Sequence, residues 1–429
     1  MPSFQKRPEQ GARPMSMDLD IAYTDSRNWD TEMPARFKWL RENEPVYWSE
    51  KDDLWVISSY EHVSNASKRQ DLFTSAKGVR PGNPVMIGLI DEDEPRHGEL
   101  RKLINKGFTP RMVKKLEITF RELTTRAIDA IAKDGQCDFV ESISVPLPLW
   151  IIAAMLGIPE EDYGKFHHWS DSMIAADGNM GDLEILAKAG KAFAEYAAYI
   201  TPIIEDRRKN PQDDLMSILT GAKDAGLLKT FEQTETIEAL NEATEFERDT
   251  NLHNDELIKL MVILLVAGNE TTRNGISGGM ELLIRNPGER QKLIDDPSLI
   301  PMAVEEMLRM VSPVNSFSRT CLEDTELDGK KILKNQQILM IYPSANRDAA
   351  VFEDPDEFRI DRDPAHVGFG VGSHFCLGAN LARMEMRVAF QELLRRLPDM
   401  EFTEGGPELR PSAIVRTCTV MKVKYTPEA

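Results

Sequence analysis

The sequence predicts a mainly α-helical fold with a smaller β portion, and three observations lead to this prediction. The longest uninterrupted helical pattern covers residues 255–284 and is apolar nearly all round between Leu260 and Ala267, as in a buried central helix. Further segments repeat the helical periodicity along much of the chain. Two short runs of β-type residues, close together near the N-terminus, are typical of a hairpin.

The individual elements follow from the same patterns. The hairpin is predicted from residues 45–48 and 54–60. A helix opens at Asp93, with Pro95 in its first turn. The polar, acid-rich and weakly periodic segment 222–254 is predicted to be a loop with a short helix. The other predicted helices are residues 35–42, 116–132, 143–156, 183–207, 301–311 and 379–394.

Composition and charge limit the class of protein. The 429 residues are 41% hydrophobic and 29% charged, which provides enough apolar material for a substantial core. Basic residues number 52 and acidic residues 71, and the resulting net charge of -19 argues against nucleic acid and anionic membranes as general partners. The first 17 residues are polar, and no run of 18 apolar residues occurs. We therefore expect a cytoplasmic protein with a disordered tail over residues 1–17 and no membrane anchor.

The cysteine and histidine spacings do not suggest a zinc site or a disulfide framework. The cysteines are scattered without C-x-x-C spacing, at Cys137, Cys321, Cys376 and Cys418. This pattern fits a reducing compartment. His167 and His168 are adjacent, and neighbouring residues on a helix point to different faces, so we do not expect them to bind a metal together.

Cys376 stands in a glycine-rich stretch immediately before a predicted helix. The stretch reads F-G-V-G-S-H-F-C-L-G from Phe369 to Gly378 and has the spacing F-x-x-G-x-x-x-C-x-G. A lone cysteine is more often a small buried apolar side chain than a ligand. Here, glycines would permit a flat cofactor to approach the backbone closely. Loop N–H groups and the N-terminus of the helix would stabilise a thiolate.

The long helix contains a second unusual stretch, A-G-N-E-T-T from Ala267 to Thr272. Gly268 costs about 1 kcal/mol inside a helix, and the Thr271 hydroxyl can bond backward to a carbonyl and bend the helix. A close crossing with another helix over a small residue would explain the glycine equally well.

Both stretches resemble motifs of the cytochrome P450 enzymes, the heme-thiolate monooxygenases. The cysteine stretch resembles the heme-binding loop of that family, and A-G-N-E-T-T resembles its A-G-x-[DE]-T-T oxygen-binding kink. The two motifs stand in the order expected for the family, with A-G-N-E-T-T over 100 residues before Cys376. The resemblance covers nearly the whole chain, from about residue 35 to the C-terminal strands. It implies a single domain over residues 18–429 with the cytochrome P450 fold, in which heme lies between the central long helix and the cysteine loop.

The resemblance also implies which residues bind the cofactor, heme b. Cys376 would be the axial ligand of the iron, and a thiolate in that position pushes electron density toward oxygen. Four residues would contact the propionates as cationic or hydrogen-bonding groups. The implied heme-binding set is His97, Arg101, Ala267, Gly268, Arg319, Phe369, Gly370, His374 and Gly378, of which the propionate group is His97, Arg101, Arg319 and His374.

Glu270 and Thr271 are the catalytic pair that the resemblance implies. Oxygen activation consumes protons inside an otherwise apolar site. Thr271 would hydrogen-bond the oxygen, and Glu270 would relay protons from solvent through water. Ala267 and Gly268 would leave space for the oxygen itself.

The E-x-x-R motif at Glu306 and Arg309 is weak by itself. Two other pairs match it, Glu205 with Arg208 and Glu392 with Arg395. The resemblance implies that the helix carrying Glu306 pairs with Arg362, from the segment before the cysteine loop. Such a triad is structural, and the loss of one member costs roughly 3 to 5 kcal/mol when the charges are buried.

A local reversal of charge covers residues 101–115. This segment carries six basic side chains and no acidic one: Arg101, Lys102, Lys106, Arg111, Lys114 and Lys115. Solvated charge is the simpler interpretation, and a docking patch for an acidic electron donor is the alternative. The resemblance places the segment near the cysteine side of the heme and implies a separate ferredoxin with an NAD(P)H-dependent ferredoxin reductase as partners.

The substrate is expected to be a hydrophobic small molecule that reacts with O2. Residues 41–47, 78–81, 267–274 and 366–370 resemble actinobacterial sterol side-chain hydroxylases, whereas residues 342–348 also resemble bacterial terpene-alcohol hydroxylases. We favour a steroid or sterol-like substrate over a terpenoid. The expected lining is apolar and consists of Val85, Met86, Ile87, Ile263, Leu264, Val314, Phe317, Ile414 and Val415.

Two other functions are compatible with parts of the sequence. A heme-thiolate peroxygenase needs neither proton delivery nor donor docking, so Glu270, Thr271 and the basic segment argue against it. A non-catalytic heme-binding sensor or carrier would have no use for the acid and alcohol pair, but the sequence does not exclude such a protein.

Overall fold

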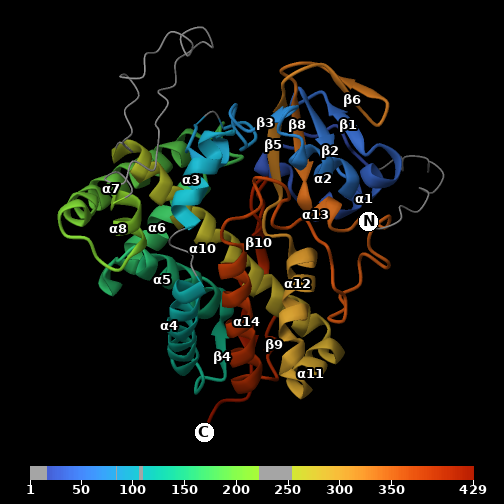
Figure 1. Ribbon diagram of the computed structural model, residues 1–429. Helices are drawn as coiled ribbons and strands as arrows, with labels where there is room; N and C mark the ends of the chain where they lie inside the picture. The colour runs from blue at the N-terminus through green and yellow to red at the C-terminus, as the bar shows by residue number, and fades with distance from the viewer. Residues whose placement is uncertain (1–16, 84, 106–109, 222–253) are drawn as a thin grey trace.

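The structure of the chain, a computed structural model, describes residues 17–83, 85–105, 110–221 and 254–429. Helices predominate in this part of the chain (Figure 1). They are α1 (Met33–Asn43), α2 (Tyr60–Lys68), α3 (Arg96–Asn105), α4 (Pro110–Asp129), α5 (Pro146–Met155), α6 (Tyr163–Ile174), α7 (Leu183–Lys209), α8 (Leu215–Gly221), α10 (Asn254–Arg285), α11 (Pro287–Asp295), α12 (Ile300–Val311), α13 (Tyr342–Ala345) and α14 (Ala379–Arg396).

The strands gather mainly in one five-stranded sheet with the order β1-β2-β8-β5-β3. In this sheet β2 and β8 are parallel, and the other neighbouring strands are antiparallel. The smaller sheets are β4-β12-β9, β10-β11 and β6-β7. The strands are β1 (Val46–Ser49), β2 (Leu54–Ile57), β3 (Phe73–Thr74), β4 (Gln136–Asp138), β5 (Ser316–Cys321), β6 (Thr325–Leu327), β7 (Lys330–Ile332), β8 (Gln337–Ile341), β9 (Glu401–Phe402), β10 (Glu408–Arg410), β11 (Thr417–Val420) and β12 (Lys422–Lys424).

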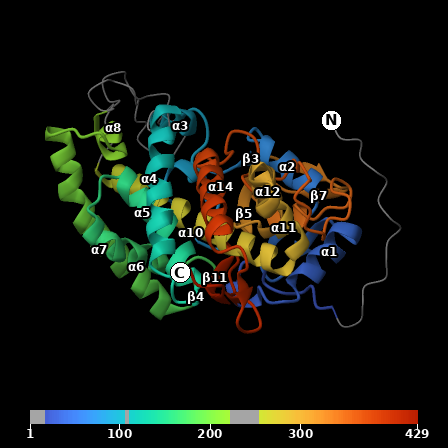
Figure 2. The ribbon, with the colours of Figure 1, turned by 90° about the horizontal axis from the view of Figure 1, so that it is seen from below.

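The helical and β portions lie side by side. In Figure 1, α3 to α8 lie on one side, the five-stranded sheet with α1, α2 and α13 lies on the other, and α10 runs across the centre. Figure 2 shows α14 between α4 and α12, and α14 packs against both of these helices and against α10. The predicted mainly helical fold with a smaller β portion is confirmed.

The central helix α10 is closely packed on several sides. It contacts α5, α6, α12 and α14, and its residues from Leu260 to Ile263 are buried. A side chain at Gly268 would place its Cβ 2.6 Å from Ile152 Cδ1 of α5, and one at Gly279 would place it 2.6 Å from Phe390 Cζ of α14. Glycine therefore permits the close helix crossing that was one of the two interpretations of Gly268.

Alternation along the central strand β8 places its side chains in two separate clusters. Ile338 and Met340 pack in one apolar cluster, whereas Leu339 and Ile341 pack in another with residues near the N-terminus of the chain. Successive strand residues point to opposite faces, and both faces of the sheet are covered here. The sheet is thus anchored on both sides.

Several predicted boundaries differ from the observed ones. The strand predicted to reach Tyr60 ends at Ile57, because the Ser59 side chain accepts a hydrogen bond from the His62 N–H and begins α2. The helix predicted over residues 143–156 is divided into a π-helical turn, Val140–Ser144, and α5. Helices α2, α6, α8, α11 and α13 were not among the predicted elements.

Two predictions fall largely outside the described residues. These are the N-terminal tail, of which only Met17 is described, and the loop over residues 222–254, of which only the last residue is described. In the described part of the chain, every helix is too short or too polar to cross a lipid bilayer.

The E-x-x-R helix α12 supplies two members of a buried ionic triad. Glu306 and Arg309 have 0% side-chain exposure, and Arg309 Nε lies 2.7 Å from Glu306 Oε2. Arg362 Nε donates to Glu306 Oε1 at 3.2 Å. Arg309 also donates to the carbonyl oxygens of Asn346 and Pro355, both at 2.8 Å. The triad therefore ties α12 to the long segment that leads toward Cys376.

We predict that Glu306→Gln lowers the free energy of unfolding by about 3 to 5 kcal/mol, because two arginines would lose their buried counter-charge. Urea denaturation would measure the change. The matched control is Glu205→Gln, which alters an E-x-x-R pair with 43% and 21% side-chain exposure and should cost less than about 1 kcal/mol. Equal losses in the two variants would contradict the prediction.

Candidate active site

Cys376 ends a tight turn that returns to Phe369. Its backbone N–H donates to the Phe369 carbonyl oxygen at 2.8 Å. Gly370 and Gly372 have φ angles of 67° and 80°, in the left-handed region that favours glycine. A Cβ at Gly372 would also lie 2.9 Å from the Ser67 carbonyl oxygen. The two glycines therefore allow the turn to close.

The thiol of Cys376 lies just before the N-terminus of α14, as the sequence predicts. Burial raises the pKa of this thiol, while the N–H groups of Gly378 and Ala379 and the guanidinium groups of Arg101 and Arg383 act to lower it. Cys376 nevertheless has exposed surface. A thiol that is surrounded by protein and yet accessible is suited to bind a metal, whereas a core cysteine would be covered.

Two arginines and two histidines gather near this loop. The rings of His97, in α3, and His374 are stacked with their centroids 4.0 Å apart. Burial, followed by the charges of Arg319, His97 and Arg101, lowers the pKa of His374 to about 3. Arg101 Nη1 donates to the Phe375 carbonyl oxygen at 2.6 Å. The structure therefore brings together the four residues that were predicted to bind propionates.

The two arginines of this group bear on whether heme would fit. Arg319, in β5, is 5% exposed, and its guanidinium donates to the Ser318 carbonyl oxygen at 2.8 Å. Within the described residues, neither Arg319 nor Arg101 forms an ion pair with a carboxylate. Buried charges are normally paired. A cofactor that carries carboxylates and a metal with affinity for thiolate would satisfy both arginines and Cys376, so these residues fit heme.

Glu270, in the middle of α10, directs its carboxylate toward α6. It is 1% exposed and accepts a hydrogen bond from Ser170 Oγ at 3.3 Å. Arg273 Nη2 lies 2.6 Å from Glu270 Oε2. Burial raises the pKa of Glu270 to about 7, although Arg273 acts to lower it. This carboxyl group can therefore exchange protons near neutral pH.

Charged groups connect Glu270 with the surface. Arg273 Nη1 also donates to Asp171 Oδ1 at 2.9 Å, and the Asp171 side chain is 37% exposed. Asp171 lines a cleft of about 290 Å³ together with His167 and His168. Both histidines border this one cleft. Among the described residues no group of three or more potential metal ligands occurs.

Thr271 and Ala267 form the accessible side of α10. Thr271 Oγ1 donates to the Ala267 carbonyl oxygen at 2.8 Å, which is the backward bond predicted from the sequence. Ala267 is exposed and Thr271 is partly exposed, although the preceding turn of the helix is buried. Gly268 faces Ile152 of α5 instead. A Cβ at Gly268 would force the Ile152 side chain to shift, and a role of Gly268 beside the cofactor stays a prediction.

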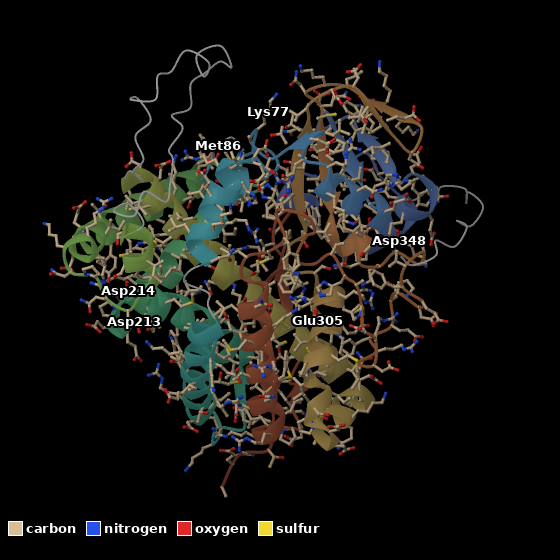
Figure 3. The ribbon with its side chains drawn as sticks, viewed as in Figure 1. Lys77, Met86, Asp213, Asp214, Glu305 and Asp348 are labelled. Carbon is tan, nitrogen blue, oxygen red and sulfur yellow. The ribbon has the colours of Figure 1, made fainter. Side chains whose placement is uncertain are left out.

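The residues predicted to line the substrate pocket lie in several parts of the structure. Val314 and Val415 pair in an isolated β-bridge. Met86 lies near α3 (Figure 3) and is partly buried, as is Ile87, whereas Val85 is 56% exposed. The buried members are Ile263, Leu264, Ile414 and Val415, and Val314 and Phe317 are partly buried. The structure thus joins Val314 with Val415 and leaves Val85 at the surface.

The basic segment is described only in part. Lys102 and Lys114 are exposed, and Lys115 forms an exposed ion pair with Asp213 at 2.8 Å. The side chains of Lys106 and Arg111 lie outside the described residues. Arg101 contacts the cysteine loop, so the segment adjoins the loop as expected.

Two groups of residues near the site were not predicted from the sequence. Glu270 and Arg273 themselves have E-x-x-R spacing, and this local signal could have predicted their ion pair. Arg383, in α14, contacts Glu305 and Phe369. No local signal predicts these contacts, because they depend on how α12, α14 and the cysteine loop meet.

Comparison with known proteins places these features in context. The cytochrome P450 family profile matches residues 31–408. A steroid C26-monooxygenase of Mycolicibacterium smegmatis is 37% identical over 395 residues, which cover 92% of each chain. A methyl-branched lipid omega-hydroxylase of Mycobacterium tuberculosis is 37% identical over 370 residues, 83% of this chain and 80% of the relative.

Solved structures agree with this result. The crystal structure of CYP109E1 from Bacillus megaterium in complex with testosterone has 32% identity and a TM-score of 0.76, covering 91% of this chain and 99% of that one. The versatile cytochrome P450 enzyme CYP109B1 from Bacillus subtilis has 32% identity and a TM-score of 0.77, covering 92% and 100%.

The raised pKa of Glu270 leads to a prediction about stability. The folded protein binds this proton more tightly than the unfolded chain, so the contribution of Glu270 to stability falls as the pH rises from 4.5 to about 7. Each pKa unit corresponds to about 1.4 kcal/mol. The free energy of unfolding of Glu270→Gln, measured relative to that of the wild type, should therefore increase by on the order of 3 kcal/mol between about pH 4.5 and 7.5.

Denaturant titrations across this pH range would measure the gain. Glu392→Gln is a suitable control, because hydrogen bonds from Arg395 and Arg121 outweigh partial burial and lower the pKa of Glu392. That carboxylate is ionised throughout the range, so the difference between the control and the wild type should stay constant. If the difference between Glu270→Gln and the wild type also stayed constant, the pKa of Glu270 in the wild type would not be raised.

Proposed function

This chain belongs to the cytochrome P450 family and is a monooxygenase, and we propose that it hydroxylates an unactivated C–H bond of a steroid or sterol-like molecule. The proposed overall reaction is R–H + O2 + 2 e- + 2 H+ to R–OH + H2O. In this proposal the electrons come from a ferredoxin, which an NAD(P)H-dependent ferredoxin reductase reduces. The catalytic unit would be a single domain over residues 18–429, located in the cytoplasm.

One observation carries the proposal: an accessible thiol lies beside Arg101, and Arg319 lies near His374 of the same loop. Neither arginine has an ion pair in the described structure. The family implies a heme-thiolate cofactor, and we propose heme b with Cys376 as the axial ligand. His97, Arg101, Arg319 and His374 would hold the propionates. When bound, the heme would supply oxygen activation, which the thiolate promotes by donating electron density.

Residues of α10 would deliver the protons that this reaction consumes. Thr271 presents its hydroxyl on the accessible side of the helix, and Glu270 has a pKa near neutrality because it is buried. Arg273 and Asp171 extend from Glu270 to the surface cleft. We propose that Glu270 takes protons from that side and that Thr271 donates a hydrogen bond at the reacting oxygen.

The steroid assignment rests on the apolar character of the proposed lining and on the relatives. A steroid C26-monooxygenase is similar over 92% of its length, and a similar solved structure holds testosterone. A terpenoid hydroxylase with the same mechanism is the alternative, and the lipid omega-hydroxylase adds a branched lipid to the candidates. All three substrates are hydrophobic, as the lining requires.

The proposed electron donor is acidic. Lys102 and Lys114 are exposed, and Arg101 contacts the Phe375 carbonyl oxygen within the cysteine loop. Positive charge next to this loop would steer an acidic protein toward the cofactor. A peroxygenase would need no such partner.

Product formation tests the proposal. Heme-loaded protein would be incubated with cholestenone or a monoterpenoid, with ferredoxin, reductase and NADPH under isotopically labelled O2. We expect one labelled oxygen atom in the steroid product and none with Cys376→Ala. Product formed only with hydrogen peroxide would favour the peroxygenase. NADPH oxidation that no hydrophobic ligand accelerates would favour the sensor or carrier.

A Thr271→Ala variant should separate electron consumption from product formation. Without the hydroxyl, proton delivery is misdirected, so NADPH oxidation continues while product per NADPH falls about tenfold or more, within the range for general acid catalysis. The ratio of hydrogen peroxide to product would measure the change. Thr272→Val is the matched control, because Thr272 is 5% exposed and not on the accessible side. An unchanged ratio in Thr271→Ala would exclude the proposed role.

A further inference from the structure

A second, partly buried ionic group lies beside the triad and reaches toward Cys376. Glu305 stands immediately before Glu306 in α12 (Figure 3). Its two carboxylate oxygens accept hydrogen bonds from Arg383 Nε at 2.7 Å and Arg383 Nη2 at 2.8 Å. His366 Nε2 lies 3.2 Å from Glu305 Oε2. Two parallel bonds of this kind fix both the position and the plane of the guanidinium.

The fixed guanidinium lies against the first residue of the cysteine loop. The Arg383 Cζ atom is 4.6 Å from the centre of the Phe369 ring. The His366 ring contacts Phe369 from another direction, at 5.7 Å between centroids, and its Nδ1 accepts a hydrogen bond from the Gly368 N–H. A cation over an aromatic face is attractive and orients the ring. Arg383 and His366 therefore both contact Phe369, whose carbonyl oxygen receives the Cys376 N–H.

Electrostatics connects the same group with the sulfur. The positive charges of Arg383 and Arg101 both favour the thiolate form of Cys376. Although burial acts to raise the pKa of Glu305, hydrogen bonds from His366 and Arg383 hold it at about 2. The carboxylate thus partly offsets the positive charge of Arg383 while it holds that charge in place.

We propose that Arg383 is a positioning residue for the axial ligand: it holds the Phe369 ring and places a positive charge near the Cys376 sulfur, and Glu305 with His366 keeps it there. This inference rests on the proposed binding of heme by Cys376. A positive charge stabilises the extra negative charge that a one-electron reduction adds to the iron and sulfur. Arg383 therefore raises the reduction potential of the bound heme, and Glu305 moderates this effect.

The competing interpretation is a purely structural tie between α12 and α14. Such a tie would affect stability when broken, but it would leave the reduction potential unchanged. The reduction potential of substrate-free protein therefore distinguishes the two roles. It requires neither turnover nor a known substrate, so a failure of the steroid assignment would leave this test intact.

Spectroelectrochemical titration of four heme-loaded proteins would make the comparison: the wild type, Arg383→Met, Glu305→Gln and Arg387→Met. Arg387 is the matched control, because it is also in α14, has the same 33% side-chain exposure and forms an ion pair with Glu117 at 2.9 Å. Within the described residues, Arg387 makes no cation–π contact with Phe369. Urea denaturation of the same proteins would record stability in parallel.

We expect Arg383→Met to favour the oxidised heme by on the order of threefold, a downward shift of about 30 mV at 59 mV per tenfold change. Glu305→Gln should shift the potential upward, because Arg383 would lose its counter-charge. Arg387→Met should match the wild type. If Arg383→Met fails to bind heme, the upward shift of Glu305→Gln still tests the proposal. Potentials equal to that of Arg387→Met in both variants, with stability reduced, would overturn it and leave only the structural tie.

Discussion

Positive charge gathered beside an accessible thiol is the interaction on which the structure of this site depends. Burial lowers the pKa of His374, and the charges of Arg319, His97 and Arg101 lower it further, to about 3. Such crowding is unfavourable unless negative charge is nearby. In the proposed enzyme, the thiolate and the two heme carboxylates would supply this negative charge. Folding must therefore hold a repulsive arrangement in place until the cofactor binds.

Several elements provide that support. The arginines and histidines come from α3, β5 and the cysteine loop. Helix α3 packs against α8, β5 pairs with β8 and β3, and the cysteine loop leads into α14. The buried triad of Glu306, Arg309 and Arg362 ties α12 to the segment before the loop. One residue earlier, Glu305 ties the same helix to α14. Two neighbouring glutamates of α12 thus hold the segment before the cysteine loop and the helix that follows it.

Local signals explain how much of this could be predicted from the sequence. The cysteine loop is a contiguous motif, so its turn and its place before α14 were predictable, as was the backward bond of Thr271. Long periodic helices were predicted well, although α2 was missed because Ser59 and its cap were read as the end of a strand. Gly268 had two interpretations, and only the crossing with α5 shows that Ile152 occupies the space beside it.

Tertiary contacts account for what could not be predicted. Arg383 and Glu305 lie 78 positions apart in the sequence, and nothing local indicates that they meet. Asp171 connects with Glu270 through Arg273, because α6 packs against α10. The placement of charge around a site is set by how helices meet, so sequence motifs indicated the candidate reacting groups but not the residues that surround them.

The absorption spectrum of the ferrous protein with carbon monoxide tests the central claim most directly, that the Cys376 thiolate binds heme iron. We expect a long-wavelength Soret band typical of thiolate ligation in the wild type and its absence in folded Cys376→Ala. A heme-loaded, folded wild-type protein without that band, or a variant that keeps it, would contradict the account.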